Sequence, residues 1–352
     1  MTGPSPPGRS VLVVSLGGTI AMLPTETRAE VTPALDADEL VAAVPALSGA
    51  AQITTHALRR VPGAHLTIDD MIELAVLIER SVAEQGFDGI VVTQGTDTIE
   101  ETAFALDLLV SCSEPVVVTG AMRHPSAAGA DGPANLLAAV QVAASRAARD
   151  LGALVVLEDR IHAARFVRKA HASSPSAFAS AVGPLGWVAE GTPRIALRPA
   201  RRTPCQRPAP GASAEPVALV TVALGDDGRI LRALPELGFG GAVVEAFGGG
   251  HVPVPVADAI GLISATMPVV VTSRARRGEV LRRTYGFTGS ETDLAARGAL
   301  SGGWLQGPAA RVLLTLLLRR GLDRGAIEAV VDYLVGGGEP PLSERPPAGI
   351  AP

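Results

Sequence analysis

The hydrophobic pattern of the chain consists of short apolar runs separated by longer amphipathic segments. Seven runs are rich in valine and show no regular polar alternation: 11–16, 89–93, 115–121, 153–157, 217–224, 241–247 and 268–273. Runs of this kind are typical of strands buried on both faces, and the segments between them suit the helical crossovers of a parallel sheet. The pattern therefore predicts an α/β protein.

A stretch without apolar periodicity divides the chain. Between Arg194 and Pro216 the sequence is rich in Arg, Pro, Ala and Gly, which is typical of a linker. We expect an N-terminal α/β domain at residues 1–195, a linker at 196–215 and a C-terminal α/β domain at 216–352. The first domain is expected to hold about four strands in a larger, mainly parallel sheet with flanking helices. The second is expected to be smaller and flavodoxin-like.

Three helix starts have local signals. The sequence Thr-Ile-Glu-Glu at 98–101 is a capping box, which predicts that the Thr98 side chain accepts from the amide of Glu101 and opens a helix through Leu109. The pairs Gly132-Pro133 and Gly307-Pro308 place a proline in a first helical turn, where its missing N–H is not needed. The first of these starts closely follows the predicted strand at 89–93.

The composition argues against several classes of partner. With 47% hydrophobic and 18% charged residues, the chain is not disordered. A net charge of −5 and 3% aromatic residues provide neither a basic surface for phosphates nor stacking platforms, so we expect no nucleic acid partner. The apolar runs fall short of the roughly 18 residues that span a bilayer, so we expect no membrane partner.

Two further features favour the cytoplasm. The first nine residues lack the basic and apolar regions of a secretory signal. The only cysteines are Cys112 and Cys205, so a disulfide framework is not expected. The six histidines show no metal-ligand spacing, and we expect neither a metal nor a cofactor.

The first candidate for chemistry follows the first strand, in Leu-Gly-Gly-Thr-Ile-Ala at 16–21. Two glycines allow a sharp turn and a close approach of the backbone, and the Thr19 hydroxyl would lie at the carboxyl end of a strand, where open α/β sheets place their sites. Thr19 is therefore a candidate nucleophile. A tight turn with a capping threonine explains the turn equally well.

Two more strand ends carry polar groups. The segment 92–98 contains Thr96 and Asp97 before a helix N-terminus, where they can orient an ammonium group and expose amides to a developing oxyanion. Helix capping explains Thr98 but assigns no role to Thr96 or Asp97. The third segment, 118–124 with 129–135, is by itself compatible with an ordinary strand end and loop.

Together these motifs resemble the bacterial-type L-asparaginases. The resemblance rests on Gly-Gly-Thr-Ile-Ala at 17–21, Gly-Thr-Asp-Thr-x-Glu-Glu-Thr-Ala at 95–103, Gly-Ala-Met-Arg at 120–123 and Ala-Asp-Gly-Pro-x-Asn-Leu at 130–136. It extends to 285–287 and 310–314 in the second domain. It implies hydrolysis of L-asparagine to L-aspartate and ammonia, as in asparagine catabolism. It also implies a homodimer or homotetramer, with each site formed by one subunit's first domain and its partner's second.

The resemblance also implies roles for individual residues. Thr19 matches the nucleophile, and Thr96 with Lys169 matches a threonine and lysine pair that handles the proton. Asp97 matches the aspartate that binds the substrate's amino group. Ala121 matches the residue whose backbone faces the substrate carboxamide, and Gly95 belongs to the same substrate-binding turn.

The sequence departs from the family pattern at several positions. Gly63, with Ala64 next to it, stands where a serine usually contacts the substrate carboxylate, so backbone N–H groups are left to bind it. No tyrosine occurs between Ala21 and Leu35, the segment expected to form a mobile lid. Gln94 stands where histidine is frequent, and His251 stands where a partner subunit's asparagine is expected.

The reaction implied is acyl transfer through Thr19 and an acyl-enzyme. A glutaminase or another small-amide hydrolase of the same fold remains an alternative, since one methylene is worth only about 1–3 kcal/mol of discrimination. A non-catalytic amino-acid-binding relative would need neither both threonines nor Lys169. An amidotransferase subunit would need a tRNA-facing domain or basic surface, which the chain lacks.

Overall fold

The computed structural model describes residues 8–18, 20, 22–25, 28–33, 37–200, 205–336 and 341. The chain divides into two compact units, Met1–Pro204 and Cys205–Pro352. Residues 205–216 contain no helix or strand. The linker boundaries of 196 and 215 stay a prediction.

Within the described residues, the first unit contains an eight-stranded sheet in the order β12-β11-β8-β7-β6-β5-β1-β4. The strands from β4 to β7 are parallel, and β8, β11 and β12 extend the sheet by antiparallel pairs. Their bounds are β1 Ser10–Ser15, β4 Gln52–Ala57, β5 Gly89–Thr93, β6 Val116–Thr119, β7 Ala153–Leu157, β8 Arg160–Ala163, β11 Gly186–Ala189 and β12 Thr192–Ile195.

The four strands predicted for this domain, β1, β5, β6 and β7, are present and form the buried centre of the sheet. The estimate of about four strands was too low. The edge strand β4 is largely exposed and polar, and β8, β11 and β12 are short, so none of them has an unbroken apolar run. The α/β class with a mainly parallel sheet is confirmed.

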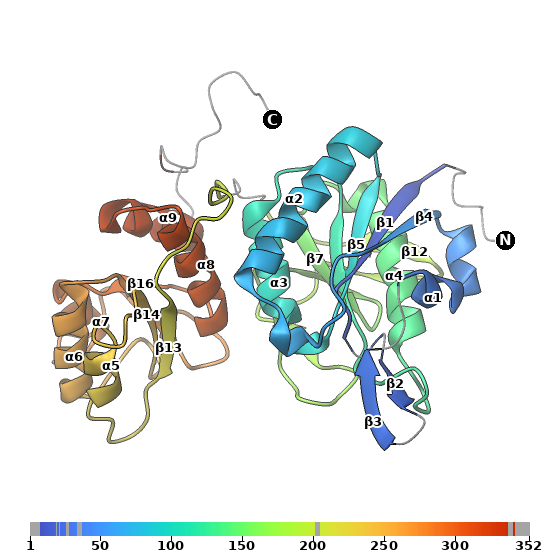
Figure 1. Cartoon of the computed structure of the whole chain (residues 1–352). Helices are drawn as coiled ribbons and strands as arrows, with labels where there is room; N and C mark the ends of the chain where they lie inside the picture. Colours follow the sequence, from blue (N-terminus) through green and yellow to red (C-terminus); the bar gives the residue numbers. More distant parts are fainter. Residues whose placement is uncertain are drawn as a thin grey trace. The chain divides into compact units, whose positions relative to one another are not determined.

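Helices cover both faces of this sheet (Figure 1). Helix α4 packs on β5, β6 and β7, and α1 contacts β4 on the same face. On the other face, α3 packs on β6 and β7, and α2 packs against α3. The bounds are α1 Ala37–Ala42, α2 Ile68–Gln85, α3 Ile99–Leu109 and α4 Gly132–Ala143, with 3-10 turns η2 Pro45–Gly49, η3 Gly63–His65, η4 Thr96–Thr98 and η5 Arg146–Ala148. The predicted starts at Gly132-Pro133 and after Thr98 are confirmed.

One local expectation for this unit was wrong. The Thr98 side chain makes no capping hydrogen bond to the helix, because its hydroxyl donates to the carbonyl of Gly63 instead, at 3.0 Å. The segment expected to be a mobile lid contains two paired antiparallel strands, β2 Met22–Thr25 and β3 Arg28–Pro33, and its role as a lid stays a prediction. Both strands extend away from the main sheet (Figure 1).

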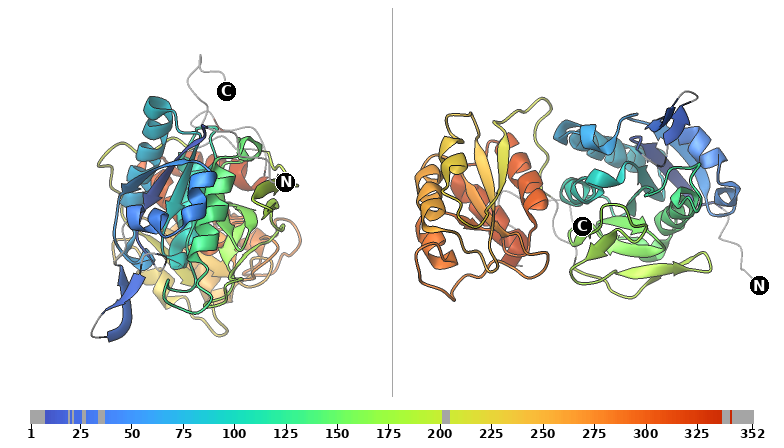
Figure 2. Two further views of the ribbon diagram at one scale, coloured as in Figure 1. Left: turned by 90° about the vertical axis from the view of Figure 1, so that its right-hand side faces the viewer. Right: turned by 90° about the horizontal axis from the view of Figure 1, so that it is seen from below.

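The second unit has a parallel four-stranded sheet in the order β13-β14-β15-β16. Helices α8 and α9 lie on one face and α5, α6 and α7 on the other (Figures 1 and 2). The bounds are β13 Val217–Thr221, β14 Gly241–Ala246, β15 Val269–Ser273, β16 Leu300–Ser301, α5 Arg229–Ala233, α6 Val254–Ser264, α7 Glu291–Ala296, α8 Gly307–Arg319 and α9 Arg324–Gly336. The three predicted strands and the start at Gly307-Pro308 are confirmed. A separate, smaller parallel domain is therefore present.

Two smaller observations complete the fold. Neither Cys112 nor Cys205 takes part in a disulfide. Among the described residues, no helix is long and apolar enough to cross a membrane.

Buried His162 makes the stability of the first unit depend on pH. Its side chain lies on β8 with only 2% exposure, and its Nδ1 is 2.9 Å from Ser180 Oγ. Burial, aided by the charge of Arg160, lowers the pKa of His162 to about 4. In the unfolded chain the pKa is about 6.5, so between these values the unfolded state binds more protons. The free energy of unfolding should therefore fall by roughly 2–3 kcal/mol as the pH drops from about 6.5 to 4.

Urea unfolding at several pH values measures this contribution. His162→Asn, which places an amide nitrogen near the position of Nδ1, should flatten the dependence between pH 6.5 and 4. The matched control His56→Asn changes an exposed histidine of the same unit and should leave the slope unaltered. An unchanged slope in His162→Asn would mean that other groups cause any loss of stability in acid.

Candidate active site

The strand order places the candidate site at the carboxyl ends of β1 and β5. After β1, the next strand of this sheet along the chain is β4, which pairs with one edge of β1. The following strands β5, β6 and β7 lie on the other side of β1. The loops after β1 and β5 therefore diverge, and ligands of open α/β sheets bind at such switch points. The glycine turn at 17–18 follows β1, the segment 94–98 follows β5, and Gly120 and Ala121 follow β6.

Three glycines allow the backbones of separate segments to touch. Gly18 has φ +87°, and a Cβ added there would lie 1.9 Å from the amide nitrogen of Gly95. A Cβ on Gly63 would lie 2.9 Å from the carbonyl oxygen of Gly95. No larger residue fits the first contact without moving the backbone. The Thr98 hydroxyl fastens this arrangement, since it donates to Gly63 and accepts from the Gln94 amide at 3.2 Å.

A hydroxyl, an amine and a carboxylate meet beside these glycines. The Lys169 amine donates to Thr96 Oγ1 at 2.9 Å and to Asp97 Oδ1 at 2.6 Å. Thr96 is buried and the Lys169 side chain is 14% exposed, whereas the Asp97 side chain is 72% exposed. The amine and the hydroxyl are thus largely withdrawn from water, while the carboxylate faces solvent.

The position of Lys169 depends on Glu100. Lys169 ends strand β9 (Val167–Lys169), which pairs with β10 (Phe178–Ser180), and its backbone N–H donates to Glu100 Oε2 at 2.7 Å. Burial raises the pKa of Glu100, although the Lys169 amide and the charges of Arg168 and Lys169 oppose this. Lys169 is the only lysine in the sequence. All the other residues in the Lys and Arg count of the chain are arginines. An arginine side chain cannot give up its proton in a protein.

The third sequence motif holds the segment after β6. Asn135 donates to the carbonyl of Gly120 at 2.9 Å and to Asp131 at 3.1 Å, and Asp131 accepts from the backbone N–H of Met122 at 3.0 Å. Ala121 lies between these anchored positions and is fully buried. The polar residues of this motif therefore fix the backbone beside Ala121.

The structure brings together most of the predicted first-domain residues. Gly63, Gly95, Thr96, Asp97 and Lys169 share the contacts above. Ala121 lies close to them, because a Cβ on its neighbour Gly120 would lie 3.3 Å from Thr96 Cγ2. Ala64 is exposed beside Gly63. Thr19 lies outside the described residues.

Sequence reasoning gave Thr98 only a capping role, and it gave no role to three further residues that position this site: Glu100, Asp131 and Asn135. All four belong to the motifs at 95–103 and 130–136, so the motifs themselves were the available signal.

His251 belongs to the second unit, where it lies at the end of a tight turn after β14. The backbones of Phe247 and His251 exchange hydrogen bonds of 2.8 and 2.9 Å. The imidazole meets Tyr285 and Phe287 edge to face, with ring centroids 4.8 and 5.1 Å away, and its Nε2 is 3.3 Å from Glu291 Oε2. A shared site with the first unit stays a prediction.

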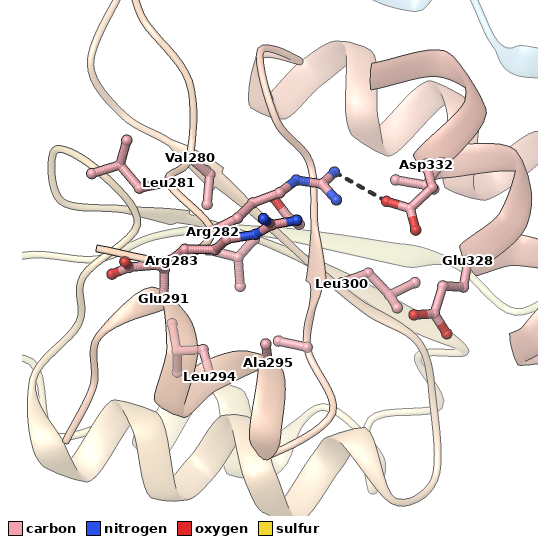
Figure 3. Close-up of a pocket in the computed structure, with 14 residues that line it drawn as sticks. Val280, Leu281, Arg282, Arg283, Glu291, Leu294, Ala295, Leu300, Glu328 and Asp332 are labelled. Atoms are coloured by element: carbon pink, nitrogen blue, oxygen red, sulfur yellow. Dashed lines mark hydrogen bonds and ion pairs between the residues drawn. The ribbon is translucent and has the colours of Figure 1, made fainter. Parts of the chain in front are cut away.

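The second unit also contains a cavity of about 290 Å³. Figure 3 shows its apolar lining, which includes Leu294 and Leu300, and the ion pair of Arg282 with Asp332 at 3.0 Å on its border. None of the predicted site residues lines it.

In the part of the chain that the structure describes, no group of three or more His, Cys, Asp and Glu residues could hold a metal.

These features define the class of protein. The open sheet presents a buried hydroxyl bonded to an amine at its switch point, next to glycine-rich backbone and an exposed carboxylate. This arrangement fits a hydrolase better than a phosphate-binding or dinucleotide-binding α/β protein.

Comparison with known proteins agrees with this class. Residues 10–201 match the family model "Asparaginase, N-terminal", and residues 216–331 match "Glutaminase/Asparaginase C-terminal domain". An L-asparaginase from Bacillus licheniformis is 36% identical over 314 residues, which cover 88% of this chain and 95% of that protein.

Two further matches bear on fold and substrate. The crystal structure of a probable cytoplasmic L-asparaginase from Campylobacter jejuni has a TM-score of 0.81 at 32% identity, covering 91% of this chain and 98% of that one. A glutaminase-asparaginase from Acinetobacter glutaminasificans is 38% identical over 187 residues, 52% of this chain and 56% of that protein. The chain belongs to the asparaginase family of amidohydrolases, which confirms the family predicted from the motifs.

Proposed function

We propose that this chain hydrolyses the side-chain amide of L-asparagine to L-aspartate and ammonia, with Thr19 as the nucleophile. The observation that carries the proposal is the 2.9 Å hydrogen bond from the single lysine to the Thr96 hydroxyl in a largely buried setting. A desolvated lysine beside a hydroxyl can serve as a proton acceptor or hold that hydroxyl polarised. A protein that only binds amino acids has no use for this pair.

The reaction proceeds in two steps. The Thr19 oxygen adds to the carboxamide carbon, the C–N bond breaks, and the nitrogen leaves as ammonia after taking up a proton. Water then adds to the resulting ester, and the C–O bond to Thr19 breaks to give the free carboxylate. Thr96 with Lys169 accepts and returns the protons in both steps. Backbone N–H groups of the 95–97 turn and of Ala121 are the candidate donors to the oxyanion.

Charge complementarity accounts for recognition of the amino acid. The exposed Asp97 carboxylate binds the α-ammonium group, and the backbone at Gly63 and Ala64 binds the α-carboxylate. Gly95 separates these two regions, and His251 from the second domain of a partner subunit completes the site. We accordingly propose a homodimer or homotetramer in the cytoplasm, a location given in the description of the Campylobacter jejuni relative.

Glutamine is the competing substrate. The C-terminal family description and the Acinetobacter glutaminasificans relative both name glutaminase activity. Ammonia release from asparagine, glutamine and small amides, measured side by side, decides between them. The proposal expects the highest kcat/KM for asparagine; a higher value for glutamine would make the chain a glutaminase, and no release from any amide would refute catalysis.

Asp97→Ala should raise KM for asparagine about 10- to 100-fold and also lower kcat, because the ammonium group loses its charged partner and Lys169 loses one acceptor. Asp97→Asn keeps the size and an acceptor for Lys169, so it should raise KM with a smaller effect on kcat. Steady-state kinetics of ammonia release measure both. An unchanged KM in both variants would mean that Asp97 does not bind the substrate and acts only at the start of the helix.

A further inference from the structure

Asp131 and Asn135 form a hydrogen-bonded pair to which the proposed chemistry gives no part. Asp131 directly precedes α4 and Asn135 lies in its first turn, where the Asn135 amide donates to Asp131 Oδ2 at 3.1 Å. Asn135 is 3% exposed, and its side-chain oxygen accepts from the backbone N–H of Glu158 at 2.9 Å. Because the oxygen faces that donor, the NH₂ group of Asn135 is fixed on the side of Asp131 and Gly120.

The pair holds the two peptide groups on either side of Ala121. Asn135 donates to the carbonyl of Gly120 at 2.9 Å, and Asp131 Oδ2 accepts from the N–H of Met122 at 3.0 Å. Both peptide bonds are trans, so the C=O and N–H of each group point in opposite directions. The N–H of Ala121 shares a peptide group with the Gly120 carbonyl and therefore points away from Asn135. For the same reason, the C=O of Ala121 points away from Asp131.

This arrangement leaves the backbone groups of Ala121 without a partner. Among the described residues, neither its N–H nor its C=O makes a hydrogen bond, although the residue is fully buried. Buried peptide groups are nearly always paired, so an unpaired donor and acceptor on one residue point to a ligand. A primary carboxamide matches both, because its oxygen accepts and its NH₂ group donates. A carboxylate matches only the N–H, since its second oxygen would face the Ala121 carbonyl.

We propose that Asp131 and Asn135 are positioning residues that direct both backbone groups of Ala121 toward the substrate and thereby select a primary carboxamide. They act through the peptide groups on either side of Ala121 and do not touch the substrate. A Cβ on Gly120 would lie 3.3 Å from Thr96 Cγ2, which places this backbone beside the proposed proton-transfer pair. The selection of the amide rests on the proposed function, whereas the orientation of the two peptide groups does not.

Hydrogen exchange of the full-length protein, followed by mass spectrometry, tests the orientation. In Asp131→Ala the amides of Met122 and Arg123 lose their acceptor, so peptides that cover residues 120–124 should exchange about tenfold faster than in the wild type. Gln141→Ala changes a polar residue in a later turn of the same helix and should leave this exchange unaltered. Wild-type exchange of these peptides in Asp131→Ala would overturn the proposal.

Kinetics with two substrates test the selection. The β-methyl ester of L-aspartate has the carbonyl of asparagine but no N–H group, so it can use only the N–H of Ala121. We expect Asn135→Ala and Asp131→Ala to lower kcat/KM about 100-fold for asparagine and about tenfold for the ester, measured as aspartate formed. Asp131→Asn keeps an acceptor for the Met122 N–H, so it should lose only about threefold on asparagine.

The outcomes separate the selection from the proposed function. Equal losses on both substrates would reduce the pair to a structural role and refute the selection. A comparable loss in Asp131→Asn and Asp131→Ala would also refute it, because the retained acceptor would then have no effect. A wild type that hydrolyses neither substrate would refute the proposed function and the selection with it, while the exchange experiment would still decide the orientation.

Discussion

Replacement of Lys169 by methionine is expected to lower kcat for asparagine by about 10²- to 10⁴-fold with little loss of fold. Its amine donates to Thr96 Oγ1 at 2.9 Å and its side chain is 14% exposed, so the substitution removes the only lysine of the sequence from a site largely withdrawn from water. Methionine has a similar length and no charge. The backbone hydrogen bond from residue 169 to Glu100 does not depend on the side chain, so strand β9 should stay in place.

Lys169→Arg separates proton transfer from positive charge. Arginine keeps the charge near Asp97 but cannot release a proton, so a similar loss of kcat is expected. The double variant Lys169→Met with Thr96→Val should be little worse than either single variant, because the two side chains act as one unit. Near wild-type activity in Lys169→Arg would show that only the charge matters.

The rival proton acceptor is Glu30, in the segment that lacks the family's tyrosine. On the present proposal Glu30→Gln changes kcat only modestly. A large loss in Glu30→Gln together with a small loss in Lys169→Met would move the base to strand β3.

Thr19→Ala is expected to reduce turnover by roughly four orders of magnitude or more, because it removes the atom that forms the acyl-enzyme. Thr19 itself lies outside the described residues, but its sequence neighbours are placed. Gly18 contacts Gly95, and Ile20 packs near Gly132, whose added Cβ would also lie 3.4 Å from Ala121 Cβ. The two sequence neighbours of Thr19 therefore lie close to Gly95 and Ala121, which are assigned to substrate.

Two measurements bear on this role. Acid quenching of the wild type during turnover, followed by mass spectrometry, should find an aspartyl ester on the peptide that contains Thr19. Thr19→Ser should keep part of the activity because it keeps a hydroxyl, and aspartate should bind Thr19→Ala as it binds the wild type. Ammonia release from Thr19→Ala at more than a few per cent of the wild-type rate would exclude Thr19 as the nucleophile.

The central strands and the class of fold could be predicted because burial on both faces leaves a direct mark on sequence. Each of β1, β5, β6 and β7 is an apolar run. The starts of α4 and α8 were also predictable, since a proline in the first turn acts through its own ring and missing N–H. The edge strand β4 left no such mark, because a strand paired on one side and exposed to solvent keeps polar residues.

The sequence alone also indicated candidate site residues through motifs after the strands, whereas Gly63, Lys169 and His251 were assigned only through the resemblance to the family. Only the tertiary structure decided what their side chains contact. Thr98 satisfies a local capping pattern, yet its hydroxyl bonds to Gly63, 35 positions away, because the order of β1 and β5 brings that backbone within reach. The partners of Lys169 lie 69 to 73 positions away. The buried pairing of His251 with Glu291 likewise joins a turn after β14 to the start of α7. Local sequence records burial and backbone preference, whereas the pairing of polar groups across such distances depends on strand order and on which groups are cut off from water.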